Sequence, residues 1–193
     1  MEITTEQVKQ LRDSTGISIM QCKKALEEAG GDMDKARIIL EKQSKAVAQK
    51  KSDRSLGAGV VASYIHTTGT IGSLVELSCE TDFVAKNEDF KKLAYDIAMH
   101  VAASAPEFLS TEEINEEIKA KAIDIFKKEL EGKPEEMKEK ILQGKLDSYF
   151  NEKVLLEQKF IKNPEMSIQD MLDGAVQKFG EKTQITRFVR FAI

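Results

Sequence analysis

The spacing of apolar residues along this 193-residue chain changes its period near Leu56. Before that point, apolar residues recur every three or four positions, which is typical of amphipathic helices. In the run that ends at Cys79, apolar and polar residues alternate, which is typical of a half-buried strand. Because one pattern does not serve both structures, we expect two parts: a helical module with a basic linker over residues 1–54, and a core domain over residues 55–193.

The first part is expected to form a bundle of three short helices. The motifs Thr4-x-x-Gln7 and Ser18-x-x-Gln21 have the form of capping boxes, in which side chains bond the free N–H groups at a helix start. A Gly-Gly pair ends the second helix, and Asp32 is suited to cap the third. In size and pattern the segment resembles ubiquitin-associated (UBA) domains, which suggests a UBA-like module.

The second part is expected to be α+β, with helices packed on a small, mostly antiparallel sheet. Residues 60–66 and 71–80 are predicted to form a β-hairpin across a Thr-Thr-Gly turn. Later strands are predicted at residues 154–160 and 184–193, with a turn at Asn163-Pro164 between them. Helices are predicted to begin at four residues suited to helix starts, which are Asn87, Ser110, Pro134 and Ser167.

The usual patterns of catalytic, metal-binding and nucleotide-binding residues are missing. The glycines lack the spacing and the lysine of a phosphate-binding loop. The only histidines, His66 and His100, lie in different predicted elements, and with Cys22 and Cys79 they give no metal-ligand spacing. His100 is expected at the edge of the apolar face of its helix, and Cys79 in the core as an unreactive thiol. We therefore expect no catalytic residues, no cofactor and no metal site.

Charge and hydropathy narrow the choice of partner. The net charge of −4 argues against direct binding of nucleic acid, which depends on neutralising phosphates. No apolar run is long enough for a membrane helix, the first residues lack a signal-peptide pattern, and cysteines are sparse. The expected location is cytoplasmic. A basic surplus follows the third predicted helix, as either a partner-binding stripe or a solvated helix end: Lys42, Lys45, Lys50, Lys51 and Arg54.

The segment that follows the hairpin places an acidic and an aromatic residue in one helical turn. Adjacent helical residues point about 100° apart, so Asp82 and Phe83 cannot both face the same core. Thr81 is suited to cap the turn. In one interpretation Phe83 fastens the helix start to the core and Asp82 complements the helix dipole. In the other, Phe83 projects beside a carboxylate as a binding element.

Five segments resemble the bacterial elongation factor Ts family, in the order in which that family carries them. They are Leu11–Gly16, Cys22–Ala29, Cys79–Asn87, Ile97–Ala103 and Arg187–Phe191. The resemblance covers essentially the whole chain. It departs from the family at Ile17-Ser18-Ile19, where a Gly-rich turn is usual. Longer members have two similar core halves, whereas this chain has room for one.

The resemblance implies a guanine-nucleotide exchange factor that binds the GTPase elongation factor Tu and promotes GDP release. The residues implied to contact the partner near its Mg²⁺ are those of the short helical turn after the hairpin: Thr81, Asp82, Phe83 and Val84. A looser assignment places Ile19, Met20 and Lys23 of the N-terminal module on the same partner. The single core implies that two chains pair as a homodimer, so that residues 55–193 serve as a dimerisation domain.

Two rival hypotheses remain open from the residues themselves. One is a UBA-like interaction module carried on a scaffold domain without exchange activity. The other is a small enzyme that uses Asp82, His100 or Cys79. The first is separated from the exchange factor by whether a GTPase that GDP releases is captured from bacterial lysate. The second predicts that Cys79→Ser loses activity, whereas the core-thiol interpretation predicts only a change of stability.

Overall fold

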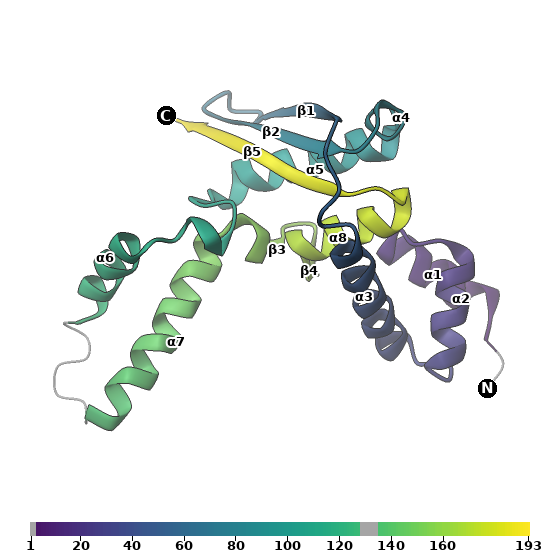
Figure 1. Cartoon of the computed structure of the whole chain (residues 1–193), viewed down its shortest axis with the longest axis horizontal. Coiled ribbons are helices and arrows are strands. Elements are labelled where there is room, and N and C mark those ends of the chain that lie inside the picture. Colours follow the sequence, from purple (N-terminus) through teal and green to yellow (C-terminus); the bar gives the residue numbers. More distant parts are fainter. Residues whose placement is uncertain (1–2, 128–134) are drawn as a thin grey trace.

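The computed structural model describes residues 3–127 and 135–193 of the chain (Figure 1). Three N-terminal helices are followed by a core that combines helices with a small antiparallel sheet. The N-terminal helices are α1 (Thr5–Thr15), α2 (Ile19–Glu28) and α3 (Met33–Lys50). The sheet consists of β1 (Ala58–Ile65), β2 (Ile71–Cys79) and β5 (Thr183–Ala192). The predicted fold, a three-helix UBA-like bundle with an α+β core, agrees with this arrangement.

The remaining elements lie between β2 and β5 in the chain. The helices are α4 (Asp82–Ala85), α5 (Glu88–Ser104), α6 (Glu116–Lys127), α7 (Glu135–Lys153) and α8 (Ile168–Phe179). Two short 3₁₀ helices are η1 (Thr111–Glu113) and η3 (Leu155–Glu157), and a small separate ribbon is formed by β3 (Lys159–Phe160) and β4 (Asn163–Ser167). In Figure 1 the N-terminal bundle and the α6–α7 pair extend from opposite ends of the core.

The N-terminal bundle has a core of its own, and each of its helix starts has a side-chain cap, although the capping box predicted at Ser18 is only half formed. The Thr4 and Gln7 side chains form a complete capping box, and Ser18 and Asp32 each accept backbone N–H bonds at the starts of α2 and α3. The buried residues come from all three helices and the first turn: Val8, Leu11, Ile17, Cys22, Ala25, Leu26, Ala36 and Leu40.

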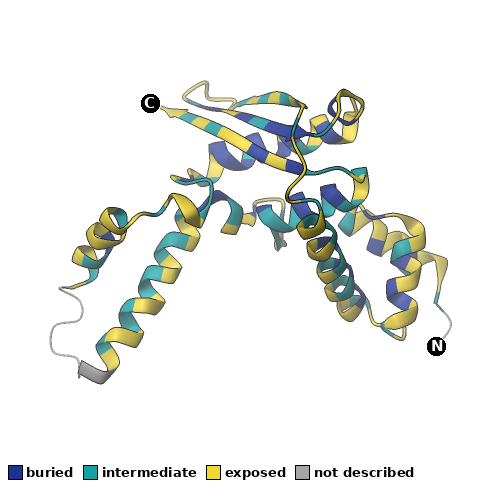
Figure 2. Ribbon diagram, viewed as in Figure 1, coloured by how far each residue is buried: buried dark blue, intermediate teal, exposed yellow. Residues whose placement is uncertain are grey.

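The sheet has β2 in the middle, with β1 and β5 antiparallel to it on either side. On its inner face Val75, Leu77 and Ile185 are almost fully buried beneath α5, and Ser73 donates a 2.6 Å hydrogen bond to the Ala98 carbonyl of that helix. Figure 2 shows the buried residues gathered in β2, α5 and the bundle, whereas α6 and α7 are mostly exposed or half-buried. The inner face therefore supplies the core, and one face of the sheet remains uncovered.

The long helix α3 joins the bundle to the core by packing along α8. Lys45 forms an ion pair with Asp170 at 3.1 Å, Lys51 donates to the Gly180 carbonyl, and Arg54 pairs with Glu80 at 3.2 Å. The predicted linker after Leu40 is thus a continuous helix that makes tertiary contacts. Lys45, Lys51 and Arg54 thus each have a bonding partner within the protein. These bonds do not decide between a partner-binding stripe and a solvated helix end.

Several local predictions are corrected by tertiary packing. His100, predicted at the edge of the apolar face of its helix, is fully buried, and its Nε2 lies 2.9 Å from the Gln158 side-chain oxygen. The strand predicted over 154–160 is mostly the 3₁₀ helix η3, with β3 limited to its last two residues. The segment that begins at Asn163 is strand β4 rather than a turn.

Of the four predicted helix starts, one precedes only a short 3₁₀ helix and one lies outside the described residues. Ser110 precedes only the short η1, and the longer α6 begins after Asn115, whose side chain accepts the Ile118 N–H at 2.9 Å. The predicted start at Pro134 lies outside the described residues. The starts at Asn87 and Ser167 are confirmed, each with a side-chain cap.

Candidate partner-binding surface

The turn after β2 forms a corner of the molecule at residues 81–86, which we call the α4 corner. Its one-turn helix, α4, contains the Ala85 N–H bond to the Thr81 carbonyl and the Lys86 N–H bond to the Asp82 carbonyl. In Figure 1, α4 lies at the end of the sheet that is nearer to the N-terminal bundle. The corner is therefore a compact projection between the sheet and the long helix α5.

Phe83 projects from the α4 corner into solvent. Its side chain is 81% exposed, whereas the next two residues, Val84 and Ala85, are buried in the core beneath the sheet. The interpretation in which Phe83 fastens the helix to the core is therefore wrong, and Val84 supplies that anchor instead. An apolar ring held on such an anchored turn is available to a partner at little cost in ordering.

Asp82 remains a charged carboxylate at neutral pH. Lys86, one helical turn later, forms an ion pair with it at 2.5 Å, and this hydrogen bond lowers the pKa of Asp82 below its ordinary value. Both side chains are about three-quarters exposed. An ion pair as exposed as this one contributes little free energy. Another cation can therefore replace Lys86 at the Asp82 carboxylate.

Thr81 does not cap α4, contrary to the sequence prediction. Its hydroxyl and its backbone N–H both donate to the carboxylate of Glu181, at 2.6 and 3.0 Å. Glu181 lies 100 residues further along the chain, in the loop between α8 and β5. The start of the corner is thus fixed by a long-range contact.

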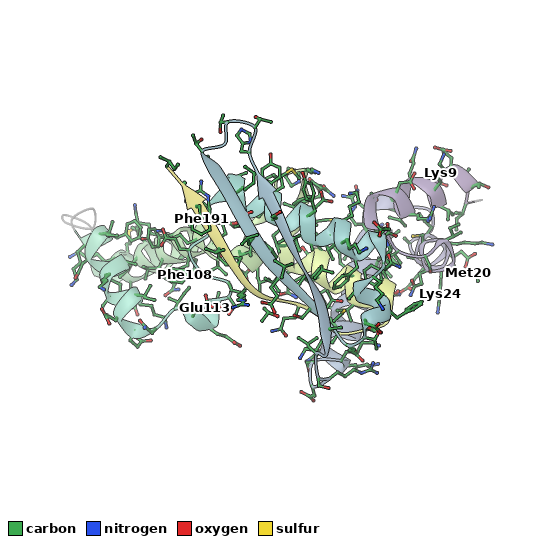
Figure 3. All side chains as sticks on the ribbon, turned by 90° about the horizontal axis from the view of Figure 1, so that it is seen from above. Lys9, Met20, Lys24, Phe108, Glu113 and Phe191 are labelled. Carbon is green, nitrogen blue, oxygen red and sulfur yellow. The ribbon has the colours of Figure 1, made fainter. Side chains whose placement is uncertain are left out.

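A second exposed surface lies at the start of α2, and we call it the α2 patch. Ile19 and Met20 are 57% and 78% exposed, and Lys23 lies one turn further on, where it pairs loosely with Glu27 at 3.9 Å. Figure 3 shows Met20 and Lys24 at the end of the molecule formed by the N-terminal helices, away from Phe108 and Glu113. The structure thus exposes all three residues assigned to this patch.

A third exposed surface, the outer sheet face, is apolar at one end. It is formed by alternate residues of the three strands, and β-register aligns Ile65, Gly72 and Phe191 across it. Ile65 and Phe191 are 66% and 63% exposed, and both line a shallow hollow of about 270 Å³ at this end of the sheet. The Ile65 side chain lies over Gly72, where a Cβ atom would come within 2.6 Å of its Cδ1. Val61, Leu74 and Val189 are also exposed on this face.

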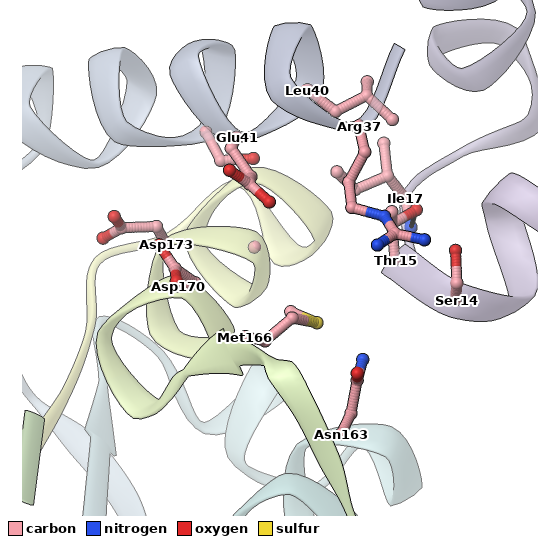
Figure 4. Close-up of a pocket in the computed structure, with 12 residues that line it drawn as sticks. Ser14, Thr15, Ile17, Arg37, Leu40, Glu41, Asn163, Met166, Asp170 and Asp173 are labelled. Atoms are coloured by element: carbon pink, nitrogen blue, oxygen red, sulfur yellow. Dashed lines mark hydrogen bonds between the residues drawn. The ribbon is translucent and has the colours of Figure 1, made fainter. Parts of the chain in front are cut away.

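Two cavities in the described part of the chain differ in size and lining. A small space between the bundle and α8, drawn in Figure 4 with Arg37, Glu41 and Asp173 on its walls, has a volume of about 30 Å³. That is room for about one water molecule, far below the volume of small-molecule sites. A wider groove of about 840 Å³ beside β5 has neither histidine nor cysteine among its lining residues.

The residues named by the enzyme hypothesis do not meet. Cys79 and His100 are both completely buried, whereas Asp82 is exposed. Burial raises the pKa of the Cys79 thiol and lowers the pKa of His100, so both are neutral near pH 7. Within residues 3–127 and 135–193 there is also no cluster of potential metal ligands. The buried position predicted for Cys79 is confirmed.

Sequence reasoning missed Glu181 and the outer sheet face. Glu181 directly follows Gly180, a helix-ending glycine with φ of 71°, and no local pattern connects it to Thr81. The apolar character of the outer face had a signal, because Val61 and Ile65 fall on the polar side of an alternating strand. Among the described residues, no helix is long and apolar enough to cross a membrane.

Comparison with known proteins gives a consistent result. The family model described as "Elongation factor TS" matches residues 6–193. Elongation factor Ts of Thermodesulfovibrio yellowstonii is 49% identical over 194 residues, which cover all of this chain and 97% of the relative. Elongation factor Ts of Thermosipho melanesiensis is 47% identical, covering 99% of this chain and 98% of the relative.

A third relative, elongation factor Ts of Carboxydothermus hydrogenoformans, is 48% identical over 99% of this chain and 89% of its own length. The range matched by the family model, residues 6–193, includes the bundle, the α4 corner and the final strand. This chain belongs to the elongation factor Ts family.

Proposed function

We propose that this protein is a translation elongation factor of the exchange type, which binds elongation factor Tu carrying GDP and promotes release of the nucleotide. Membership of the elongation factor Ts family supports this function. The single observation that carries the mechanism is Phe83, an exposed aromatic ring on a turn whose next residues are buried in the core. The protein acts by binding, and it makes or breaks no covalent bond itself.

The proposed action begins with insertion of Phe83 into an apolar slot of the GTPase. Burying such a ring contributes about 1.5–3 kcal/mol, which is available to shift the partner's own elements. The partner holds Mg²⁺ in a near-octahedral shell that tolerates little distortion. Displacing the groups around that ion loosens the phosphate contacts, and GDP leaves faster. In this proposal Asp82 arrives as a carboxylate beside the same metal site.

Thermodynamic linkage makes the effect reciprocal. If this protein weakens GDP binding by some factor, GDP must weaken the binding of this protein by the same factor. The exchange factor therefore needs high affinity for the nucleotide-free GTPase and needs no acid or base. The buried and neutral states of Cys79 and His100 are compatible with that requirement.

The α2 patch is proposed as a second contact with the same GTPase. Ile19, Met20 and Lys23 offer an apolar surface with one cation at its edge. The patch and the α4 corner lie toward the same end of the molecule, so that one partner can reach both (Figure 1). We assign the patch to affinity, and we divide the chain into domains at residues 54 and 55 because the two parts have separate cores.

The outer sheet face is proposed as the contact between two copies in a homodimer. Antiparallel sheets commonly pack face to face, and an exposed apolar patch on a sheet is typical of such an interface. Ile65, Leu74 and Phe191 would occupy its centre, and all three line the hollow at that end of the sheet. A homodimer would also supply the second core half that longer family members carry in one chain.

The exchange proposal is tested by stopped-flow release of fluorescent GDP from elongation factor Tu. We expect release to accelerate as the protein is added at micromolar concentration, and excess GDP to reverse the complex. The rival UBA-like scaffold predicts binding by the isolated bundle and no acceleration. Absence of acceleration by the whole chain would refute the proposal.

Light scattering after size exclusion tests the homodimer. We expect the mass of two chains for the native protein and of one chain for Leu74→Glu, because a charge would be buried at the centre of the interface. Glu157→Lys, a charge reversal outside the sheet, serves as the control. A native protein with the mass of one chain would contradict this part of the proposal.

A further inference from the structure

The α4 corner is joined to the α8–β5 loop by two reciprocal carboxylate contacts. Glu181 accepts both the N–H and the hydroxyl of Thr81, at 3.0 and 2.6 Å. In the opposite direction, Glu80 accepts the backbone N–H of Lys182 at 2.6 Å, and this bond is the main reason that the pKa of Glu80 lies below its ordinary value. Each loop thus supplies a carboxylate to the backbone of the other.

The end of α3 fastens the same region from a third side. Lys182 donates its amine to the Ser52 carbonyl at 2.6 Å, Lys51 donates to the Gly180 carbonyl, and Arg54 pairs with Glu80. Three segments that are far apart in sequence therefore converge behind the α4 corner. None of these contacts involves Phe83 or its ring.

The corner needs this support because α4 has so few internal bonds. It is a single turn, and Thr81, which precedes it in an extended conformation with φ of −127° and ψ of 156°, gives it no side-chain cap. A turn of this length is unstable by itself, because helix nucleation fixes several residues for one hydrogen bond. Val84 and Ala85 hold its lower side in the core, and Glu181 holds its beginning.

We propose that Glu181 is a positioning residue for nucleotide exchange, one that fixes the direction in which Phe83 projects. The inference rests on the proposed function of the α4 corner. Hydrogen bonds to a charged acceptor are stronger than neutral ones, and here two of them bind consecutive donors of one residue. They restrict the backbone directly before Asp82 and Phe83. The α4 corner is thereby already ordered in the free protein. Binding to the partner then costs less conformational entropy.

Loss of the Glu181 carboxylate should change the orientation of Phe83 more than it changes the stability of the fold. The Thr81 N–H and hydroxyl are at the surface, so water can replace the acceptor and no buried donor is left unpaired. The core anchors at Val84 and Ala85 remain. Glu181→Ala is therefore expected to leave the melting temperature nearly unchanged while the corner becomes more mobile.

The test compares Glu181→Ala, Glu181→Gln and the native chain in GDP release from elongation factor Tu. We expect Glu181→Ala to lower the maximal release rate about tenfold. Displacing a functional side chain, here Phe83, by about 1 Å has effects of this order or larger. Glu181→Gln should recover to within about twofold of the native rate, because its amide can accept the N–H and donate to the hydroxyl oxygen. Glu113→Ala is the matched control, since Glu113 also accepts a backbone N–H, that of Leu109, at 2.6 Å.

Hydrogen exchange in the free protein gives a readout that does not depend on activity. The amides of Ala85 and Lys86 are bonded within the corner, and we expect both to exchange about tenfold faster in Glu181→Ala but not in Glu113→Ala. Thr81→Val, which removes only the hydroxyl donor, should give a smaller increase. This second variant keeps the test decisive if Glu181→Ala folds poorly.

The outcomes separate this inference from the proposed function. If Glu181→Ala exchanges GDP at the native rate, or its Ala85 and Lys86 amides are as protected as before, the positioning role is wrong while the exchange function stands. Equal loss in Glu181→Ala and Glu181→Gln also overturns it, because the charge itself would then contact the partner. If the native chain fails to release GDP, the proposed function fails, and amide exchange still decides whether Glu181 orders the corner.

Discussion

The α4 corner and the α2 patch present similar surfaces by different means. Each exposes a large apolar side chain near a charged one at the start of a helix, Phe83 at the corner and Met20 at the patch. At the patch, Ser18 caps the helix and bonds to a residue three positions later. At the corner, the equivalent position is held by Glu181, 100 residues away.

The difference indicates a division of labour. A surface fixed by a local cap forms whenever its own helix forms, which suits it to adding affinity. A surface fixed by distant loops has a fixed orientation relative to the whole core. Such a surface is suited to displacing groups at a defined point of the partner. We therefore expect changes at the corner to lower the maximal exchange rate and changes at the patch to weaken binding. The following predictions test that contrast, in order of expected effect.

The largest effect is expected from the double variant Asp82→Ala with Phe83→Ala. The maximal GDP release rate should fall about 10- to 100-fold, which corresponds to losing the burial of one aromatic ring. The melting temperature should change little, because both side chains are exposed and make no core contact. Stopped-flow kinetics and thermal unfolding measure the two quantities. Native exchange by a folded double variant would show that the wedge mechanism is wrong.

A smaller effect is expected from Met20→Ala. The concentration of this protein that gives half-maximal release should rise about three- to tenfold, while the maximal rate stays within about twofold, because the patch adds binding energy only. Met137→Ala is the matched control, since Met137 is also exposed but lies on α7 in the opposite arm. A lower maximal rate in Met20→Ala with unchanged half-saturation would erase the proposed distinction between the two surfaces.

A change of stability confined to the bundle is expected from Ser18→Ala. Removing a side-chain cap costs about 1 kcal/mol, and the loss should appear in the amide protection of α2. Thr81→Ala should leave the amide protection of α2 unchanged, because the Thr81 side chain bonds Glu181 in the other part of the molecule. Site-resolved hydrogen exchange compares the variants. Equal loss of protection in the core and the bundle of Ser18→Ala would contradict the proposal that each part is stabilised mainly by its own core.

The smallest effect is a pH dependence restricted to the core. Burial lowers the pKa of His100 below its ordinary value, so the unfolded chain takes up a proton at a higher pH than the folded chain does. The stability of the core is therefore full above about pH 6.5 and falls as the pH decreases below it. Residues 3–54 contain no histidine, so the bundle should lack this slope.

Denaturant unfolding between pH 7.5 and 5.5 measures the His100 effect. His100→Gln should flatten the slope, whereas His66→Gln, the control at an exposed histidine, should leave it unchanged. The lower pKa of buried His100 fixes the sign of the effect. Core stability that increases on acidification through this range would be inconsistent with it.

The sequence by itself determined the elements whose signals are local. Thr4, Ser18, Asn87 and Ser167 cap helices as their patterns predict, because a cap bonds to residues two or three positions away. The alternation before Cys79 fixed the hairpin and its buried face, because side chains of a strand alternate between two faces. The order of family-like segments was likewise enough to predict the family.

Only the tertiary structure decided how those elements support the candidate site. Phe83 had two open interpretations in sequence, and the burial of Val84 beneath the sheet decided between them. His100 was misplaced because its burial depends on Gln158, which lies 58 residues away. The role of Glu181 was invisible for the same reason. Contacts between distant segments depend on how the chain packs, and a local pattern of residues carries no record of the partner that packing will provide.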